Sequence, residues 1–191
     1  GTGADAALIT IHGTGGNGTL WNTGIMMISD SLITSQEGDI SLVGVGGNGS
    51  GLGNNGLEIR SVVSSTGVGA NAAKINITGT GGSGSQFARG IYVMLGNITS
   101  IDGDITMIGE GGNVANDGGD GIVLALNGQV NSTGTSAGAG TISLTGTGRG
   151  VYNSYGVKID GSGGIAKVAS NYRNVDITGA GGGSTHDNYG I

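Results

Sequence analysis

The sequence contains no proline and no cysteine, and charged and aromatic residues are both scarce. Without cysteine, the chain can form neither disulfides nor zinc–thiolate sites. Its 13 acidic and 7 basic side chains leave a net charge of −6, so it lacks the basic surface that attracts nucleic acids and anionic membranes. No stretch approaches the ~18 apolar residues of a membrane-spanning helix. We therefore expect neither a nucleic-acid partner nor a membrane span.

Glycine is abundant, with 46 glycines among 191 residues. The chain is not collagen, because a triple helix needs glycine at every third position together with abundant proline. Nor does it have the composition of a disordered linker, since 36% of its residues are hydrophobic and only 10% are charged. The chain must therefore fold around an apolar core.

One block of sequence recurs six times, starting at Ile9, Ile40, Ile75, Ile105, Ile142 and Val175, with a mean period of about 33 residues. In each copy the first and third residues are apolar, the second is polar, and the fifth is glycine. This alternation is typical of a strand with one buried face. A fixed period of this length indicates a repeat architecture.

Two further apolar segments follow each of the first five blocks. The first opens with a glycine, at Gly24, Gly56, Gly90, Gly121 and Gly156; the second is weaker and centres on Ile33, Val63, Ile98, Val130 and Val168. Three short strands per repeat, with no helical pattern, predict an all-β, right-handed, three-sided parallel β-helix of about six coils. The lack of proline agrees with this fold, because proline would remove a hydrogen bond between coils.

A longer period of two coils, about 66 residues, is also visible. The distance from the third strand to the next block alternates between short and long, and Trp21 and Phe87 each lie 12 residues after the start of an odd-numbered block. The copies start near residues 8, 74 and 141 and cover 8–73, 74–140 and 141–191. We expect residues 1–191 to form a single solenoid segment of a much longer repeat protein, because neither end offers a capping element.

Repeats of the form strand, Gly-Thr-Gly-Gly-x-Gly loop and Gly-Ile/Val strand, as in residues 75–93, resemble those of giant bacterial surface and secreted proteins of the filamentous-haemagglutinin and autotransporter-adhesin type. The resemblance covers essentially the whole chain. It implies a structural rod or adhesin, extracellular or at the cell surface, without catalytic residues. The partners that we expect are other copies of the rod, end to end or side by side, and cell-surface glycans or another cell.

Two sets of residues are candidates for binding. Five of the seven aromatic residues lie in the loop between the first and second strands: Trp21, Phe87, Tyr152, Tyr155 and Tyr189. Rings in a row along one edge suit sugar or partner binding, although they could instead fold over the loop and cap the core. The outward positions of the second strand are unusually apolar at Met26, Ile28, Tyr92, Met94, Val123 and Ala125. That face predicts lateral packing between rods, unless the turns of the third strand cover it.

The sequence leaves several other functions open without favouring them. Residues 118–124 resemble a calcium-binding β-roll repeat, with Asn116, Asp117 and Asp120 as candidate ligands, but Val123 stands where that motif needs aspartate. A carbohydrate-active β-helix enzyme would need clustered carboxylates, whereas Lys74 lies between Asp39 and Asp104 in a ladder of opposite charges. An ice-binding solenoid would need unbroken ranks of threonine. We expect no enzyme and no cofactor, with calcium as an alternative.

Overall fold

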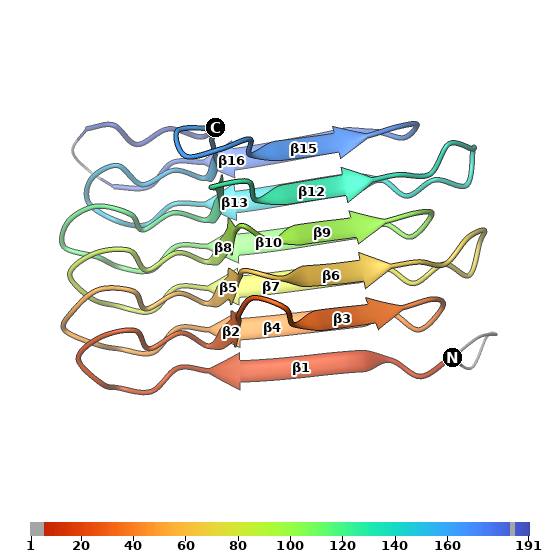
Figure 1. Ribbon diagram of the computed structural model, residues 1–191. Helices are drawn as coiled ribbons and strands as arrows, with labels where there is room; N and C mark the ends of the chain where they lie inside the picture. Colours follow the sequence, from red (N-terminus) through yellow and green to blue (C-terminus); the bar gives the residue numbers. More distant parts are fainter. Residues whose placement is uncertain (1–5, 184–185) are drawn as a thin grey trace.

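The structure is a computed structural model that describes residues 6–183 and 186–191. Sixteen strands and no helix are found in that part of the chain, and every strand pairing is parallel (Figure 1). Accordingly, no helix there is long and apolar enough to cross a membrane. The prediction of a three-sided parallel β-helix is confirmed.

The strands form three sheets, each of which takes one strand from every coil. The first sheet is β1 (Ile9–Thr14), β4 (Ile40–Val45), β7 (Ile75–Thr80), β10 (Ile105–Glu110), β13 (Ile142–Thr147) and β16 (Val175–Ala180). The second is β2 (Ile25–Met27), β5 (Leu57–Ile59), β8 (Ile91–Met94), β11 (Ile122–Ala125) and β14 (Val157–Asp160). The third is β3 (Leu32–Ser35), β6 (Val62–Ser65), β9 (Asn97–Ser100), β12 (Gln129–Ser132) and β15 (Lys167–Ser170). Five complete turns and one further first-sheet strand result.

The core runs along the axis between the three sheets. Equivalent residues of successive coils are in register, as in the column Ile40, Ile75 and Ile105. In the central coils these inward residues are fully buried: Ile40, Leu42, Leu57, Ile59, Ile75, Ile77, Ile91, Val93, Ile98, Ile105, Met107, Ile122, Leu124, Val130, Ile142 and Leu144. Each such side chain contributes about 1.5–3 kcal/mol on burial. The inward positions predicted from the alternation are therefore correct for the first two strands of the central coils.

Burial decreases in the outermost coils, because a coil there is covered on one side only. Ile9 and Ile11 are half-buried, and the inward residues Val175 and Ile159 are 37% and 41% exposed. The alternation predicts that Ile159 is buried like its counterpart Leu124, with which it is in register. Its exposure follows from its place in β14, the edge strand of the second sheet.

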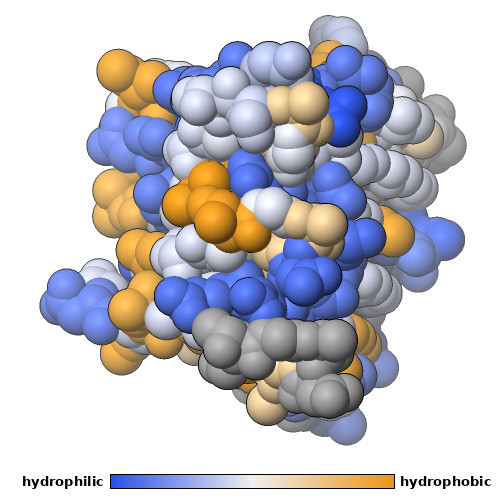
Figure 2. All heavy atoms as spheres, turned by 90° about the vertical axis from the view of Figure 1, so that its right-hand side faces the viewer, coloured by the Kyte–Doolittle hydropathy of each residue, from blue (hydrophilic) through white to orange (hydrophobic). Residues whose placement is uncertain are grey.

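The turns between the third and first sheets alternate in length, as the two-coil period predicts. Four-residue turns span 36–39, 101–104 and 171–174, and nine-residue turns span 66–74 and 133–141. The long turns project beyond the short ones at the right of Figure 1. Figure 2 looks onto this side, where blue and white atoms prevail and hydrophobic atoms gather along the left-hand edge and in a patch near the centre. The opposite side of the coil carries the loops with the candidate aromatic residues.

Candidate functional site

The loops between the first and second sheets share one backbone feature. Each loop has a residue with a positive φ at the equivalent position: Trp21 (58°), Gly53 (84°), Phe87 (55°), Gly118 (85°), Asn153 (43°) and Asp187 (60°); the last loop has a second one at Gly183 (83°). In the first four coils this residue is alternately aromatic and glycine, and the aromatic ring lies over the glycine of the next coil. A Cβ atom at Gly118 would come within 2.6 Å of Phe87 Cδ1, and one at Gly53 would overlap the ring of Trp21. The missing side chains make room for the rings.

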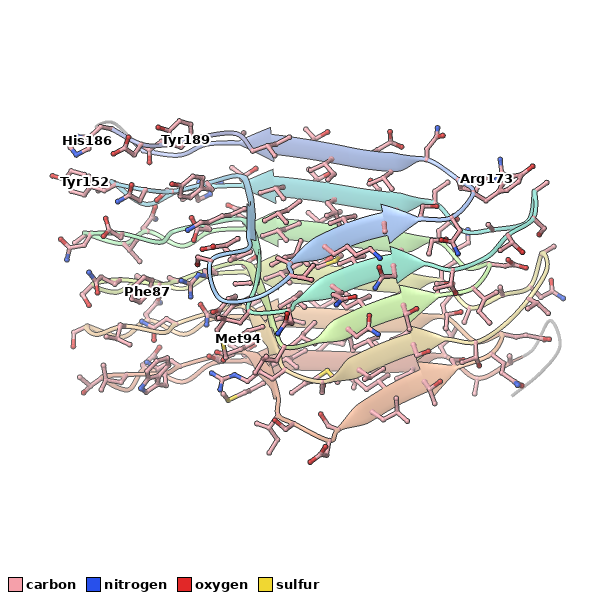
Figure 3. The ribbon with its side chains drawn as sticks, turned by 45° about the horizontal axis from the view of Figure 1, so that its top comes forward. Phe87, Met94, Tyr152, Arg173, His186 and Tyr189 are labelled. Atoms are coloured by element: carbon pink, nitrogen blue, oxygen red, sulfur yellow. The ribbon has the colours of Figure 1, made fainter. Side chains whose placement is uncertain are left out.

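The structure places the five predicted aromatic residues along this loop edge, where Figure 3 labels Phe87, Tyr152 and Tyr189. Trp21 and Tyr189 are exposed, while Phe87, Tyr152 and Tyr155 are half-buried. Tyr155 stacks on Tyr189 with ring centroids 5.5 Å apart, and Tyr152 meets the ring of His186 edge to face at 5.2 Å. Along this edge some rings are therefore partly packed and others exposed, and binding of a sugar or partner by these rings stays a prediction.

Two of these rings line a depression across the third, fourth and fifth coils, which we call the edge pocket. Its volume is about 230 Å³, and its lining consists of Phe87, Arg89, Asp117, Gly118, Asp120, Asn153, Tyr155 and Lys158. Four of these side chains are charged, two of each sign. The edge pocket therefore combines apolar walls with both hydrogen-bond donors and acceptors.

An ion pair forms the inner part of the edge pocket. Arg89 Nε lies 3.4 Å from Asp120 Oδ2, and the other carboxylate oxygen accepts a hydrogen bond of 2.9 Å from the backbone N–H of Tyr155. The Arg89 guanidinium lies over the rings of Phe87 and Tyr92, at 4.8 and 4.4 Å from their centroids. Asp120 is only 3% exposed. Its burial raises the pKa of this carboxyl, although the Tyr155 N–H and the Arg89 charge oppose the rise.

The outer part of the edge pocket is more accessible. Asp117 Oδ1 accepts a hydrogen bond of 3.0 Å from Asn153 Nδ2. Lys158 Nζ lies 3.3 Å from Asp160 Oδ2 and 5.0 Å from the centroid of Tyr155. Hydrogen bonds from Ser162 lower the pKa of Asp160 to about 2, so this partner of Lys158 is ionised at neutral pH.

The calcium alternative concerns two of these carboxylates. Asp117 and Asp120 both accept hydrogen bonds from protein groups, and Asp120 also faces Arg89. Among the described residues, no group of three or more histidine, cysteine, aspartate or glutamate side chains could hold a metal ion. Calcium binding at this loop stays an untested alternative.

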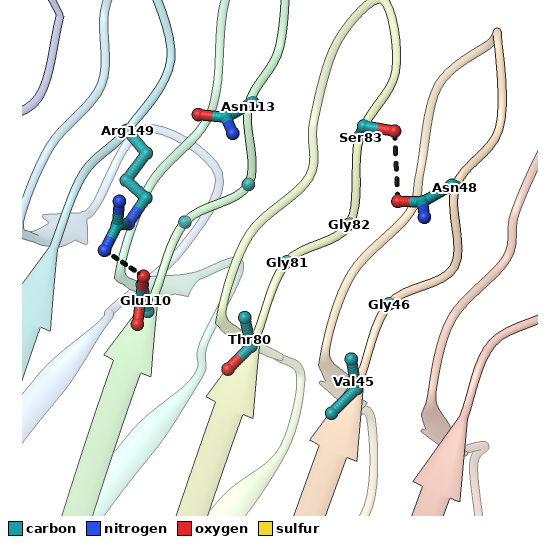
Figure 4. A pocket seen from close by; sticks show the side chains of 12 residues that line it. Val45, Gly46, Asn48, Thr80, Gly81, Gly82, Ser83, Glu110, Asn113 and Arg149 are labelled. Atoms are coloured by element: carbon teal, nitrogen blue, oxygen red, sulfur yellow. Dashed lines mark hydrogen bonds and ion pairs between the residues drawn. The ribbon is translucent and has the colours of Figure 1, made fainter.

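A second depression, the axial groove, runs parallel to the rod axis beside the C-terminal ends of the first-sheet strands (Figure 4). Its volume is about 280 Å³; Val45, Thr80 and Glu110 lie on one side, Asn48, Ser83 and Asn113 on the other, and glycines between them. Ser83 Oγ donates a hydrogen bond of 3.1 Å to Asn48 Oδ1, and Arg149 forms an ion pair with Glu110. Sequence reasoning missed this groove, although the Gly-Gly pair after several first-sheet strands was a signal for it.

The apolar outward face of the second sheet is less uniform than the sequence suggests. Met26 and Ile28 are exposed, at 52% and 63%, whereas Tyr92 and Met94 are half-buried and Val123 is only 3% exposed. Glu58 occupies the position in register between Met26 and Tyr92, and it is buried and ion-paired with Arg60. Among the predicted outward residues, the well-exposed ones are therefore Met26 and Ile28 in the first coil, and Val123 does not belong to the exposed surface.

Sequence reasoning also missed Arg89, Asn153 and Lys158 in the edge pocket. A signal for Arg89 was present, because Arg89 and Asp120 each come directly before the opening glycine of a second strand, in adjacent coils. Opposite charges at equivalent positions of neighbouring coils lie one strand spacing apart.

Comparisons with protein-family models, with curated proteins and with solved structures give no match to this chain, so its function must be inferred from its own residues.

Proposed function

We propose that the chain is a structural and adhesive segment of a giant extracellular bacterial protein. The observation that carries the proposal is the use of polar side chains, which tie one coil to the next. In a solenoid each repeat contacts only its neighbours, so stability depends on the interfaces between adjacent coils. Side chains that strengthen those interfaces suit a rod that bears load along its axis.

Aspartates supply one set of these ties. Asp39 Oδ1 accepts a hydrogen bond of 2.8 Å from the backbone N–H of Lys74, and Asp104 Oδ1 accepts one of 2.9 Å from that of Thr141. Asp120 does the same for Tyr155. In each case the donor lies one coil further along the chain. At the less buried Asp39 and Asp104, a carboxylate that accepts such a bond stabilises the coil interface by more than a neutral acceptor would.

Asparagines supply a second set, in the loops at the aromatic edge. Asn54 Oδ1 accepts hydrogen bonds from the backbone N–H and the side-chain amide of Asn22, at 3.1 and 2.9 Å. Its own amide donates to the carbonyl of Ser83 at 2.6 Å. Asn54 is fully buried. Because its partners Asn22 and Ser83 lie in the coils before and after it, this one side chain joins three coils.

The charge ladder that the sequence predicts is part of the same system. Lys74 Nζ lies 3.7 Å from Asp104 Oδ2, while Asp39 contacts the backbone rather than the ammonium group of Lys74. Both members of the Lys74–Asp104 pair are well exposed, so the pair itself contributes at most about 1 kcal/mol. With several aspartates committed to coil interfaces, the arrangement favours a rod over a carbohydrate-active enzyme.

The adhesive part of the proposal draws on the exposed surfaces. The aromatic edge would meet cell-surface glycans or another cell. Other copies of the rod would pack side by side against Met26 and Ile28. The isolated 191-residue chain would also stack end to end on its outer coils, where inward residues such as Val175 reach the surface.

Adhesion can be tested with beads that carry the 191-residue chain, washed under shear over a layer of epithelial cells. We expect more of these beads to be retained than of beads coated with albumin. Equal retention of the two kinds of bead would contradict the proposal. Incubation of the chain with polysaccharides provides a second check, because release of new reducing ends would support the enzyme alternative.

A further inference from the structure

We propose that the edge pocket binds a single saccharide ring, a hexopyranose unit of a larger glycan. This inference rests on the proposed adhesive function and names the ligand class that the pocket suits. It depends on a comparison of the pocket with the equivalent place in the first two-coil unit, which has the same backbone but different side chains.

The positions that carry charge in the edge pocket are neutral one unit earlier. The residue before the opening glycine of the second strand is Thr23, Asn55, Arg89, Asp120, Tyr155 and Tyr189 in successive coils. Two coils earlier, the position of Arg89 is therefore occupied by Thr23 and that of Asp120 by Asn55. In the same way, Leu52 occupies the position of Asp117. Because the first unit adopts the same strands and the same positive φ in its loops, the fold does not require these charges.

Asn55 shows that an amide is sufficient for the structural role of Asp120. Asn55 Oδ1 accepts a hydrogen bond of 3.0 Å from the backbone N–H of Arg89, as Asp120 Oδ1 accepts one of 2.9 Å from that of Tyr155. A buried carboxylate loses its hydration, and even an ion pair compensates this loss only in part. A carboxylate at position 120 therefore adds an unfavourable contribution that the fold could avoid, which indicates a role beyond folding.

The chemistry of the lining fits a sugar ring. Every sugar hydroxyl both donates and accepts hydrogen bonds, and the edge pocket sets the acceptors Asp117 and Asp120 beside the donors Arg89 and Lys158. The Nε atom of Arg89 is buried without a hydrogen-bond partner of suitable geometry, so the protein does not fully satisfy this guanidinium. The Phe87 ring supplies an apolar wall for the C–H groups of a pyranose.

The charge balance and the volume of the edge pocket restrict the class of ligand that it can bind. Arg89 faces Asp120 and Lys158 faces Asp160, so a free phosphate or sulfate would find no net positive charge. The volume of about 230 Å³ is below the roughly 300–1,000 Å³ of sites for drug-sized ligands. One ring fits, and neighbouring sugar units would lie outside it along the exposed aromatic edge.

Saturation-transfer NMR on the 191-residue chain tests the inference, with the methyl glycosides of glucose, galactose, mannose and N-acetylglucosamine as probes. We expect transfer to at least one probe and a dissociation constant at least about tenfold higher for Asp120→Asn, because a charge-assisted hydrogen bond is lost. Far-UV circular dichroism should stay nearly unchanged, because Asn55 accepts the same backbone hydrogen bond in the first unit. The melting temperature should fall, because Arg89 loses the charge that faces it. Glu110→Gln, which removes one negative charge in the axial groove, is the matched control and should bind like the wild type.

The inference is overturned if no probe receives saturation, or if Asp120→Asn binds as tightly as the wild type. If Asp120→Asn does not fold, Arg89→Thr, which copies the first unit, takes its place with the same expected loss. The bead experiment separates this inference from the proposed function. If beads with and without the substitution adhere equally, the chain is adhesive but does not adhere through the edge pocket. If the chain binds a glycoside but the beads do not adhere, the edge pocket is a sugar site and the proposed adhesive function is wrong.

Discussion

Replacing Gly53 by alanine tests the pairing of rings and glycines along the loop edge. Gly53 has a φ of 84°, and a Cβ atom there would lie 2.7 Å from Trp21 Cζ3 and closer still to Cε3. The chain offers a matched control in Gly69, whose φ is 79° but whose added Cβ would meet no atom within 4 Å. The two substitutions share the backbone strain and differ in the contact with the ring.

The expected magnitudes follow from these two contributions. A left-handed conformation costs an L-residue about 1–2 kcal/mol relative to glycine. An overpacked contact adds about 1–3 kcal/mol, so Gly53→Ala should destabilise the chain by about 2–5 kcal/mol and Gly69→Ala by about 1–2 kcal/mol. In a domain of this size the melting temperature falls by about 2–4 °C per kcal/mol.

Urea unfolding followed by far-UV circular dichroism would compare the two variants. Trp21 is the only tryptophan, so its fluorescence also reports directly on the contact with Gly53. The same substitutions in a Trp21→Ala background complete a double-mutant cycle. In that background Gly53→Ala should destabilise the chain no more than Gly69→Ala does, and the coupling free energy between positions 21 and 53 should be about 1–3 kcal/mol. Equal destabilisation by the two glycine substitutions in the wild-type background would refute the pairing.

Three further outcomes are expected. Ile77→Ala should destabilise the core by about 2–5 kcal/mol in urea unfolding, whereas Ile108→Ala on the exposed face of the same sheet should stay within about 0.5 kcal/mol; similar losses would contradict the assigned orientation. Burial tends to raise the pKa of Asp104, but hydrogen bonds from Thr141 and the Lys74 charge outweigh it and hold the pKa below its ordinary value. The resulting stabilisation is present above about pH 4 and is lost as pH falls through the lowered pKa, so Asp104→Asn should flatten the acid dependence of the urea midpoint. Met26→Ser with Ile28→Ser should weaken concentration-dependent association in sedimentation without lowering the melting temperature, and unchanged association would exclude this face.

The fold could be predicted because the constraints on a stacked coil repeat in every copy. Each first-sheet strand must place apolar residues inward at alternate positions, and a slip by one residue would expose all of them. Ile75 and Ile77 therefore report the same orientation as Ile105 and Met107 one coil later. The exposure of Ile159 could not be read from this pattern, because it depends on which neighbouring coils cover a residue rather than on its own alternation.

The candidate site could be predicted only in outline. The aromatic edge follows from loop position, but the packing of the Phe87 ring over Gly118 depends on backbone angles that the residue order does not reveal. The same is true of Val123: its alternation marks it as outward, yet its cross-strand neighbours are the long side chains of Tyr92 and Lys158. Those neighbours offer a physical reason for its burial on the outer face, which alternation alone does not describe.

The repeat itself separates what the fold needs from what one position adds. The inward columns that start at Ile9 and Ile11 in the first sheet, and at Ile25 and Met27 in the second, stay apolar in every coil, so the fold tolerates little change there. By contrast, the column that contains Thr23, Asn55 and Arg89 changes in size and charge from coil to coil. The backbone hydrogen bonds at this column are nevertheless kept: the N–H of Gly24 donates to the carbonyl of Asn55, and the N–H of Gly56 donates to that of Arg89. Chemistry specific to one coil is therefore best sought in such tolerant columns, and the edge pocket lies where two of them, at the positions of Asp117 and Asp120, meet.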